Sequence, residues 1–379
     1  MKITKVTTFV LEQELTEKDR FAFSQARVHK RTSFVCRIDT DEGISGWGEA
    51  FGPARIHKKI VDAYYAEYLI GKDPFYTRVI WDDLYNMFRD NGQKGVTVEA
   101  LSAVDIALWD IKGKAAGRPV YQMMGGTPRE KVLPYATGMY RRYTKDEIEE
   151  TTAEAVGYVE AGFKAVKLKI GFGFDYDIRL VRSVRKAVGK DVKIMIDANH
   201  AYNATTAIRL GSMLEEKDIL WFEEPVPPED WRGYQEVRSK SRIPISGGEA
   251  EFTRYGMYHL IRNRCVDIVQ PDCTVTGGLS EFMTISTLCT LENLQCFPHV
   301  WGSGIALTTG IHAAFSLPDF PPSLEPADVF LEYDRTRNIF REQLAEGVPE
   351  MKDGWIYPPK KPGLGIEINE DLIRRYSVE

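Results

Sequence analysis

The sequence lacks the features that mark membrane proteins and nucleic-acid-binding proteins. It has no run of 18 apolar residues, so we expect no membrane-spanning helix. Its first six residues lack the apolar core of a signal peptide and are typical of a strand. Acidic residues outnumber basic ones by 55 to 49, and a net charge of −6 provides no basic surface for nucleic acid or an anionic membrane.

Cysteine is also scarce. The five cysteines are odd in number and scattered, and no two of them form a CxxC pair. This usage is typical of free thiols in a reducing compartment, so we expect a cytoplasmic protein. Low-complexity tracts and heptad repeats are missing as well. What is present is a chain of 379 residues, long enough to fold around a large core without a disulfide or a structural metal.

The first 125 residues differ in pattern from the rest. Residues 3–11, 32–39 and 45–49 are rich in β-branched side chains and predict three strands. Residues 98–114 carry apolar side chains at three- and four-residue spacing, which predicts a helix. Gly117 and Pro119 follow in the order expected at a helix end. We therefore expect an α+β unit over residues 1–125.

From about residue 131 short apolar runs alternate with amphipathic helical stretches such as 144–161 and 176–188. Eight runs predict strands: 132–137, 165–170, 193–198, 220–223, 244–248, 268–271, 295–298 and 329–332. Eight βα units over about 200 residues favour a (β/α)8 TIM-type barrel over the alternative, an open doubly wound sheet. We place this α/β barrel at residues 126–340 and a C-terminal segment that returns to the first unit at 341–379.

Acidic side chains stand at the ends of successive predicted strands. Asp197, Glu223 and Glu249 follow one another at intervals of 26 residues, and Asp272 and His299 continue the series. In a barrel these strand ends surround one point, where active sites are built. Three converging carboxylates require a cation, and an all-oxygen set suits Mg²⁺. The alternative for each acid alone is that it caps the following helix.

Two lysines precede this series. Lys167 and Lys169 are two residues apart on one predicted strand, so both side chains point to the same face, into the barrel. One of them is a candidate base whose pKa we expect to be lowered by the other lysine and by a nearby cation. With the divalent cation, the two lysines would make the site cationic and suited to an anionic substrate. The alternative is a solvated charge pair at an edge.

Asp272 and His299 form a second candidate pair, because a carboxylate beside a histidine fixes the orientation and tautomer of the ring. Alone, His299 could equally be a satisfied core histidine. Glu332 ends the last predicted strand and is placed to balance charge at the site. This assembly suits removal of a proton α to a carboxylate, with a cation stabilising an enediolate and Lys169 and His299 as base and acid.

These motifs resemble the mandelate racemase branch of the enolase superfamily along nearly the whole chain. The matching segments are KLK at 167–169, DAN at 197–199, EEP at 223–225, GE at 248–249, QPD at 270–272 and PHVWGSG at 298–304. The resemblance implies Mg²⁺ ligands at Asp197, Glu223 and Glu249, acid/base residues at Lys169 and His299, and supporting roles for Lys167, Asp272 and Glu332. It also implies that residues 1–125 form a capping domain and that Pro362–Asn369 forms its return strand.

Within this branch, Asp272 occupies the position at which muconate-lactonising relatives carry a lysine. Segments such as LSAVDIALWDIKGK and MIDANHAY resemble galactarolactone cycloisomerases. That resemblance implies β-elimination that opens a D-galactaro- or D-glucarolactone to a 3-deoxy-2-keto-hexarate. The alternatives are dehydration of an acyclic aldonate or aldarate, racemisation or epimerisation of a 2-hydroxy acid, and a non-catalytic barrel that binds sugar acids.

The remaining expectations concern ligands and assembly. We expect one Mg²⁺ per subunit, with Mn²⁺ as a substitute, an anionic small-molecule substrate, and a homo-oligomer between dimer and octamer, as the family resemblance implies. The cap loops should set specificity, and an arginine there can bind a distal carboxylate in bidentate fashion. The candidate substrate-binding residues are Arg27, Arg55, Tyr140, Asn199, His200 and Glu224.

Overall fold

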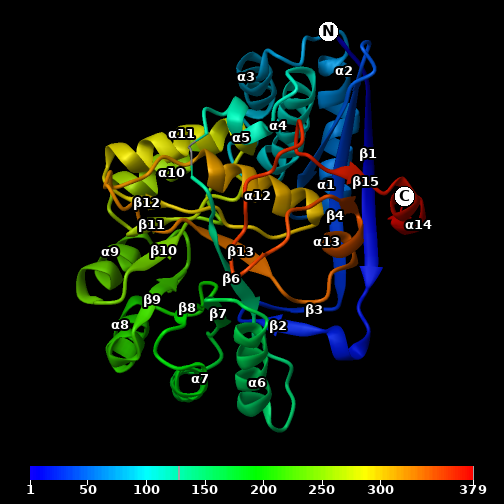
Figure 1. Cartoon of the computed structure of the whole chain (residues 1–379). Coiled ribbons are helices and arrows are strands. Elements are labelled where there is room, and N and C mark those ends of the chain that lie inside the picture. Colours follow the sequence, from blue (N-terminus) through cyan, green and yellow to red (C-terminus); the bar gives the residue numbers. More distant parts are fainter. Residues whose placement is uncertain (127–128, 379) are drawn as a thin grey trace.

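The computed structural model describes residues 1–126 and 129–378, which form a barrel and a cap beside it (Figure 1). The cap sheet is antiparallel and has the order β16-β1-β4-β5. Its strands are β1 (Ile3–Glu14), β4 (Lys30–Thr40), β5 (Ser45–Ala50) and β16 (Ser377–Val378). The three strands expected near the N-terminus are confirmed. The fourth strand, from the end of the chain, was not expected because two residues carry no readable alternation.

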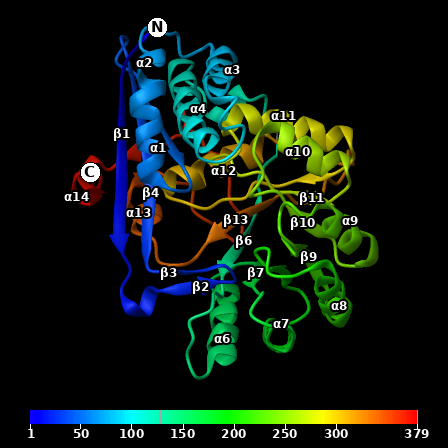
Figure 2. The same ribbon diagram turned by 180° about the vertical axis from the view of Figure 1, so that it is seen from behind.

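Helices cover one face of the cap sheet (Figure 2). They are α1 (Ala54–Ile60), α2 (Ala66–Leu69), α3 (Thr77–Phe88) and α4 (Val96–Ala115), with a π-helical turn at Val61–Tyr65. The short α5 (Val120–Met123) follows α4, and its Val120 belongs to the hydrophobic core of the barrel. The long α4 lies directly on β5, where Gly46 and Gly48 allow the close approach. A Cβ atom at either glycine would overlap a carbonyl oxygen of α4. The cap therefore has a hydrophobic core of its own.

A hairpin of β2 (Phe21–Phe23) and β3 (Ala26–Val28) leaves the cap sheet and reaches the barrel (Figure 1). At its tip, Ser24 Oγ donates hydrogen bonds to the carbonyl oxygens of Ala198 at 2.7 Å and Asn199 at 2.9 Å. Because these carbonyls follow the strand that carries Asp197, the hairpin is fixed at the mouth of the barrel.

The barrel confirms the expected fold. Its eight strands are β6 (Leu133–Gly138), β7 (Ala165–Lys169), β8 (Lys193–Asp197), β9 (Ile219–Glu223), β10 (Ile245–Gly247), β11 (Ile268–Val269), β12 (Gln295–Cys296) and β13 (Phe330–Asp334). They pair in parallel in the order β12-β11-β10-β9-β8-β7-β6-β13. The first strand pairs with the eighth, which excludes an open doubly wound sheet. Within the described residues the one break lies between β12 and β13.

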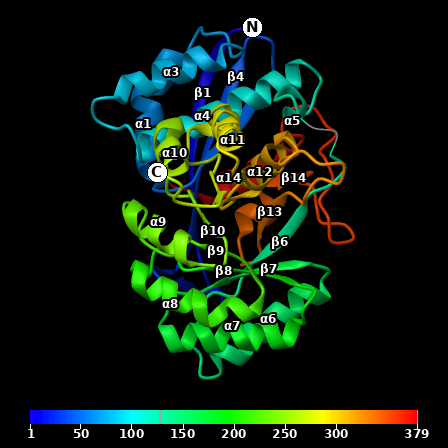
Figure 3. The same cartoon turned by 90° about the vertical axis from the view of Figure 1, so that its left-hand side faces the viewer.

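A helix follows each barrel strand and packs outside the sheet (Figure 3). These helices are α6 (Glu147–Glu160), α7 (Phe174–Val188), α8 (Ala204–Leu214), α9 (Trp231–Lys240), α10 (Thr253–Arg262), α11 (Gly278–Leu291), α12 (Gly304–Ser316) and the short α13 (Ile339–Gln343). The described residues contain no helix that is both long and apolar enough to cross a membrane.

The C-terminal segment links the two units in a way that differs from the sequence-based expectation. Within Pro362–Asn369, the strand β15 (Glu367–Ile368) pairs with β14 (Ala345–Glu346), not with the cap sheet. The strand that joins the cap sheet is β16, which follows α14 (Glu370–Tyr376) and pairs with β1. Pro362–Asn369 contacts the cap through Leu364, whose N–H donates to Asp110 Oδ1 of α4 at 2.8 Å.

Two buried carboxylates of the cap bind the N-termini of α11 and α12, the helices that follow β11 and β12. Glu49 of β5 accepts hydrogen bonds from the N–H groups of Ser303 and Ala306 at the start of α12, both at 3.0 Å. Asp105 of α4 accepts from the N–H of Ser280 at the start of α11 at 2.9 Å. An anion at a helix N-terminus is favourable because unpaired N–H groups point at it. The cap therefore fixes the loops that carry Asp272 and His299.

Candidate active site

Three carboxylates meet at the carboxyl ends of neighbouring barrel strands. Asp197 ends β8, Glu223 ends β9, and Glu249 follows β10. One oxygen from each lies within 4.8 Å of the others. Trp221 Nε1 and Gln270 Nε2 donate to Glu223 Oε2 at 3.0 and 2.8 Å, which fixes the orientation of that carboxylate.

This acidic cluster fits a hard divalent cation. Its donor atoms are all carboxylate oxygens, the set that Mg²⁺ prefers. Glu249 Oε2 is buried and accepts no hydrogen bond, although His299 Nε2 lies 3.2 Å away, so this oxygen still has room to bind a cation. Burial raises the pKa of Glu223 to about 7 against the attraction of Lys167, and the neighbouring carboxylates Asp197, Glu332 and Glu249 add to the rise, so a cation bound here would relieve both effects. We therefore assign Asp197, Glu223 and Glu249 as the residues that would hold the metal.

The two lysines of β7 both point into the barrel and differ in access. Lys167 Nζ is fully buried and lies 2.5 Å from Glu223 and 2.7 Å from Glu332. Lys169 Nζ pairs with Asp197, lies 3.0 Å from Asn199 Oδ1, and lines a cavity. Only Lys169 of this pair can therefore meet a substrate, whereas Lys167 holds two carboxylates in place.

His299 lies across the acidic cluster from Lys169. Its Nδ1 is 2.7 Å from Asp272 Oδ2, and its Nε2 is 3.2 Å from Glu249 and 3.5 Å from Glu332. Asp272 is itself fixed by the N–H and hydroxyl of Thr274, both at 2.6 Å. The aspartate orients the ring so that Nε2 faces the site.

The electrostatic environment of these groups follows from their neighbours. Burial alone would lower the pKa of His299, but Glu249, Glu332 and Asp272 outweigh it and raise the pKa to about 10. Burial would raise the pKa of Glu332, but Lys167 and His299 lower it to about 2. Glu332 is therefore ionised and acts as a counter-ion inside the barrel.

Lys169 and His299 line one cavity of about 220 Å³ at the barrel mouth. The cap contributes Phe23, Val28, Lys30, Arg31, Thr32 and Phe51, and the barrel contributes Tyr140, Lys169, Asn199, Glu249, His299, Trp301, Gly302 and Asn338. The cavity lies between the two units, which is where a cap can set substrate specificity.

The six candidate substrate-binding residues fall into two groups. Tyr140 and Asn199 line the cavity. His200 Nε2 lies 3.2 Å from Glu224 Oε2, and these two side chains pair with each other outside its lining. Tyr140 also lies against the catalytic lysine, with Lys169 Nζ 5.3 Å from its ring centroid.

The two cap arginines chosen from the sequence do not reach the cavity. Val28 lines it, and alternation along β3 turns the preceding Arg27 to the other face, where it lies 4.4 Å from the Tyr143 ring centroid. Arg55 starts α1, has a half-exposed side chain, and pairs with Glu12 Oε1 at 2.9 Å. The arginine that does line the cavity is Arg31, which sequence reasoning missed.

The charge of the site also differs from the expectation. Besides the three metal-binding acids, Asp272 and Glu332 face the same space as the two lysines and His299. Five carboxylates against two lysines and a protonated His299 leave a net charge of −2, which a divalent cation just offsets. The lysine pair and the metal therefore do not make this end of the cavity cationic.

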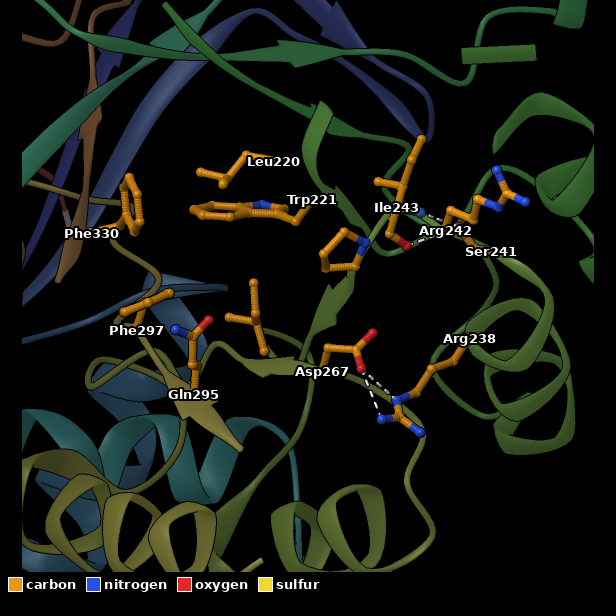
Figure 4. Close-up of a pocket in the computed structure, with 12 residues that line it drawn as sticks. Leu220, Trp221, Arg238, Ser241, Arg242, Ile243, Asp267, Gln295, Phe297 and Phe330 are labelled. Carbon is orange, nitrogen blue, oxygen red and sulfur yellow. Dashed lines mark hydrogen bonds and ion pairs between the residues drawn. The ribbon is translucent and has the colours of Figure 1, made fainter. Parts of the chain in front are cut away.

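A second cavity, of about 440 Å³, lies at the opposite end of the barrel (Figure 4). It is lined by residues at or before the starts of strands, among them Leu220, Gln295 and Phe330. The charged pair there is Arg238 with Asp267 at 2.8 Å. Because none of the strand-end acids borders it, this cavity is not the catalytic one.

Comparison with known proteins agrees with this geometry. The family model for the mandelate racemase / muconate lactonizing enzyme N-terminal domain matches residues 5–125. The enolase C-terminal domain-like model matches residues 150–372. The chain is 42% identical over 376 residues to D-galactarolactone cycloisomerase of Agrobacterium fabrum, covering 99% of both chains. It is 32% identical to arabinonate dehydratase of Saccharolobus solfataricus, covering 95% of this chain and 94% of the relative.

Solved structures show the same fold. The 3,6-anhydro-D-galactonate cycloisomerase from Zobellia galactanivorans superposes with a TM-score of 0.91 at 37% identity, covering all of both chains. A racemase from Streptomyces coelicolor with bound magnesium superposes with a TM-score of 0.89 at 25% identity, covering 99% of this chain and 100% of the other. The chain is therefore an enzyme that belongs to the mandelate racemase / muconate lactonizing enzyme family of the enolase superfamily.

Proposed function

We propose that this enzyme is a Mg²⁺-dependent cycloisomerase that opens a D-galactaro- or D-glucarolactone by β-elimination. The observation that carries the proposal is the joint lining of one cavity by Lys169, His299 and the carboxylate of Glu249. Bound by Asp197, Glu223 and Glu249, Mg²⁺ would stabilise the negative charge that develops on a substrate carboxylate as the α-proton leaves. The similarity to D-galactarolactone cycloisomerase supports the lactone as substrate.

The chain's own residues divide the remaining work. A cation bound by the acidic cluster would lower the pKa of Lys169 and of His299. The one of them that is then neutral removes the proton α to the carboxylate, and the C–H electron pair forms a C=C bond. The C–O bond at the β-carbon breaks, and its electron pair leaves on the lactone oxygen. Because that oxygen belongs to an acyl group, it departs as a stable carboxylate and needs no proton. The resulting enol then takes up a proton on carbon to give the 3-deoxy-2-keto product.

Lys167, Asp272 and Glu332 support this chemistry without reaching the substrate. Lys167 holds Glu223 and Glu332 at 2.5 and 2.7 Å, and Asp272 orients His299 at 2.7 Å. Asn199 Oδ1 accepts from Lys169 Nζ at 3.0 Å and helps to aim it at the cavity. Such fixed neighbours preserve the reacting geometry.

A direct test is incubation of the Mg²⁺-loaded enzyme with each lactone in D₂O, with NMR of the product. We expect consumption of one lactone and deuterium at the carbon that becomes the 3-deoxy position. Failure to consume any aldarolactone would exclude this proposal. A parallel series with Mn²⁺ in place of Mg²⁺ measures whether the acidic cluster accepts the larger ion.

A second candidate is dehydration of an acyclic aldonate or aldarate, favoured by the similarity to arabinonate dehydratase. In that reaction the leaving group is hydroxide, which needs a proton from a general acid such as His299. A coupled assay for 2-keto-3-deoxy acids across a sugar-acid library distinguishes the two. Deuterium exchange at the α-carbon without elimination would instead indicate a racemase or epimerase.

A further inference from the structure

Arg31 is a buried cation at the end of the cavity away from the metal-binding acids. It stands at the second residue of β4, and only 4% of it is exposed. Its guanidinium packs against two neighbouring aromatic rings, 4.8 Å from the Phe21 centroid and 5.1 Å from the Trp301 centroid. This packing restricts its rotation, so the group is already positioned for a ligand.

The hydrogen bonds of Arg31 leave part of the guanidinium available. Nε donates to the carbonyl oxygen of Arg337 at 3.1 Å, and Nη2 donates to Thr336 Oγ1. Nη1 donates no hydrogen bond to residues 1–126 or 129–378. Since Arg31 lines the cavity, that nitrogen is free to face a bound molecule.

The charge of Arg31 is only partly balanced by the protein. Its nearest carboxylate, Asp334, is 3.7 Å from Nη2. Asp334 Oδ2 also pairs directly with Arg341, and Asp334 Oδ1 accepts from Thr336. Asp334 is thus shared between Arg31 and Arg341, and the other carboxylate nearby, Glu342, lies 3.7 Å from Arg341, so Arg31 has no close carboxylate of its own. A buried charge without a full partner is costly, so this site favours an anion.

Three aromatic rings lie near Arg31 and Lys169, which both line the cavity. Arg31 contacts Phe21 and Trp301, the ring of Tyr140 lies 4.5 Å from that of Phe21 and 5.8 Å from that of Trp301, and Lys169 Nζ is 5.3 Å from the Tyr140 centroid. The cavity therefore has a metal-binding end that takes one carboxylate and an arginine end that takes a second anionic group.

We propose that Arg31 is the specificity-determining residue that binds the distal carboxyl group of the substrate. This inference rests on the proposed function and deepens it. In the lactone the distal carboxyl is the acyl group of the ring, and on ring opening it becomes a carboxylate. Arg31 thus meets the leaving group where negative charge develops, and its planar fork matches a carboxylate. Lys30, which the cap also contributes to the cavity, is already paired with Glu12 at 3.1 Å.

The first experiment uses the wild-type enzyme loaded with Mg²⁺ and needs no variant. Calorimetric titration compares galactarate with galactonate, which differ only in a carboxylate against a hydroxymethyl group at one end. We expect galactarate to bind about 10- to 100-fold more tightly, as one charge-assisted contact gives. Equal affinity for the two acids would overturn the proposal, whether or not any lactone is turned over.

The second experiment assigns the preference to Arg31. Arg31→Gln should bring the affinity for galactarate down to that for galactonate and change the affinity for galactonate less than about threefold. Arg337→Gln is the matched control, because its half-exposed side chain pairs with Glu342 and does not line the cavity. If folded Arg31→Gln loses affinity for galactarate and galactonate equally, Arg31 has a structural role only and the assignment is refuted.

The two proposals fail separately. Turnover of a lactone together with equal affinity for galactarate and galactonate would support the cycloisomerase proposal and refute the role of Arg31. A preference for galactarate without lactone turnover would keep Arg31 as a dicarboxylate contact and refute the cycloisomerase. If Arg31→Gln does not fold, Arg31→Lys can replace it, because lysine keeps the positive charge but lacks the planar guanidinium. An unchanged preference of Arg31→Lys for galactarate over galactonate would contradict a bidentate contact between the guanidinium and the carboxylate.

Discussion

Lowering the pH should weaken the fold through His312, a histidine far from the catalytic cluster. His312 lies in α12 and is fully buried. Its Nδ1 accepts a hydrogen bond from the N–H of Tyr121 at 3.1 Å, so the proton is on Nε2, which donates to the carbonyl oxygen of Leu364 at 3.0 Å. The neutral ring thereby joins the barrel to α5 and to the C-terminal segment.

Protonation would place a second proton against the N–H of Tyr121 and bury a charge. Burial lowers the pKa of His312 from 6.5 to about 4, although the bond to Leu364 opposes the change. Between these values the unfolded chain binds the proton and the folded chain does not. Stability is therefore intact above pH 6.5 and decreases as the pH falls toward 4, by about 3 kcal/mol in total.

The assay is urea unfolding of the wild-type protein and of His312→Gln between pH 4.5 and 8. All other titrating groups are shared, so the difference between the two curves isolates His312. We expect the wild type to lose up to about 1.4 kcal/mol per pH unit relative to the variant below pH 6.5. Parallel curves across this range would refute the reasoning.

The remaining predictions concern the catalytic cluster and the contact between Glu49 of the cap and α12 of the barrel. Lys169→Met and His299→Asn should each lower kcat at least about 100-fold, measured by product NMR, with thermal midpoints within a few degrees of wild type; activity above a tenth of wild type in either would contradict its role. Chelation of Mg²⁺ should abolish turnover by the wild-type enzyme, and added Mg²⁺ should restore it. Added Mg²⁺ should not restore turnover by Asp197→Asn, which lacks one of the proposed metal-binding carboxylates. Glu49→Gln should destabilise the fold by about 3 kcal/mol in urea unfolding, because the amide removes the negative charge at the start of α12 and replaces one acceptor oxygen, which takes hydrogen bonds from Ser33 and Ser303, by an NH2 donor. A loss below about 1 kcal/mol would show that Glu49 does not stabilise the contact between the cap and the barrel.

The placement of the proposed metal-binding and acid/base residues could be predicted from the sequence because each position is defined locally. An apolar run that ends in a polar side chain predicts both a strand and the residue at its carboxyl end. Parallel pairing of neighbouring strands then brings these ends together. Asp197, Glu223, Glu249 and His299 lie together for this reason. Lys167 and Lys169 share a face by the two-residue repeat of a strand.

The substrate end of the cavity could not be predicted in the same way. Arg27, Arg55 and Arg31 look alike in the sequence, since each stands in or near a cap loop. Which one lines the cavity depends on the path of the hairpin and on where β4 begins. Arg31 was missed because its partner Asp334 is 303 residues away and belongs to the last barrel strand.

The sequence by itself determined the barrel, the cap and the position of every acid and base at a strand end, because periodicity and strand topology act over short stretches of chain. Only the tertiary structure decided that Glu49 and Asp105 bind the helices after His299 and Asp272, that β16 closes the cap sheet, and that Arg31 supplies the cation at the distal end of the cavity. Those contacts join segments that are distant in sequence, and their formation depends on packing between the two units, for which no local pattern exists.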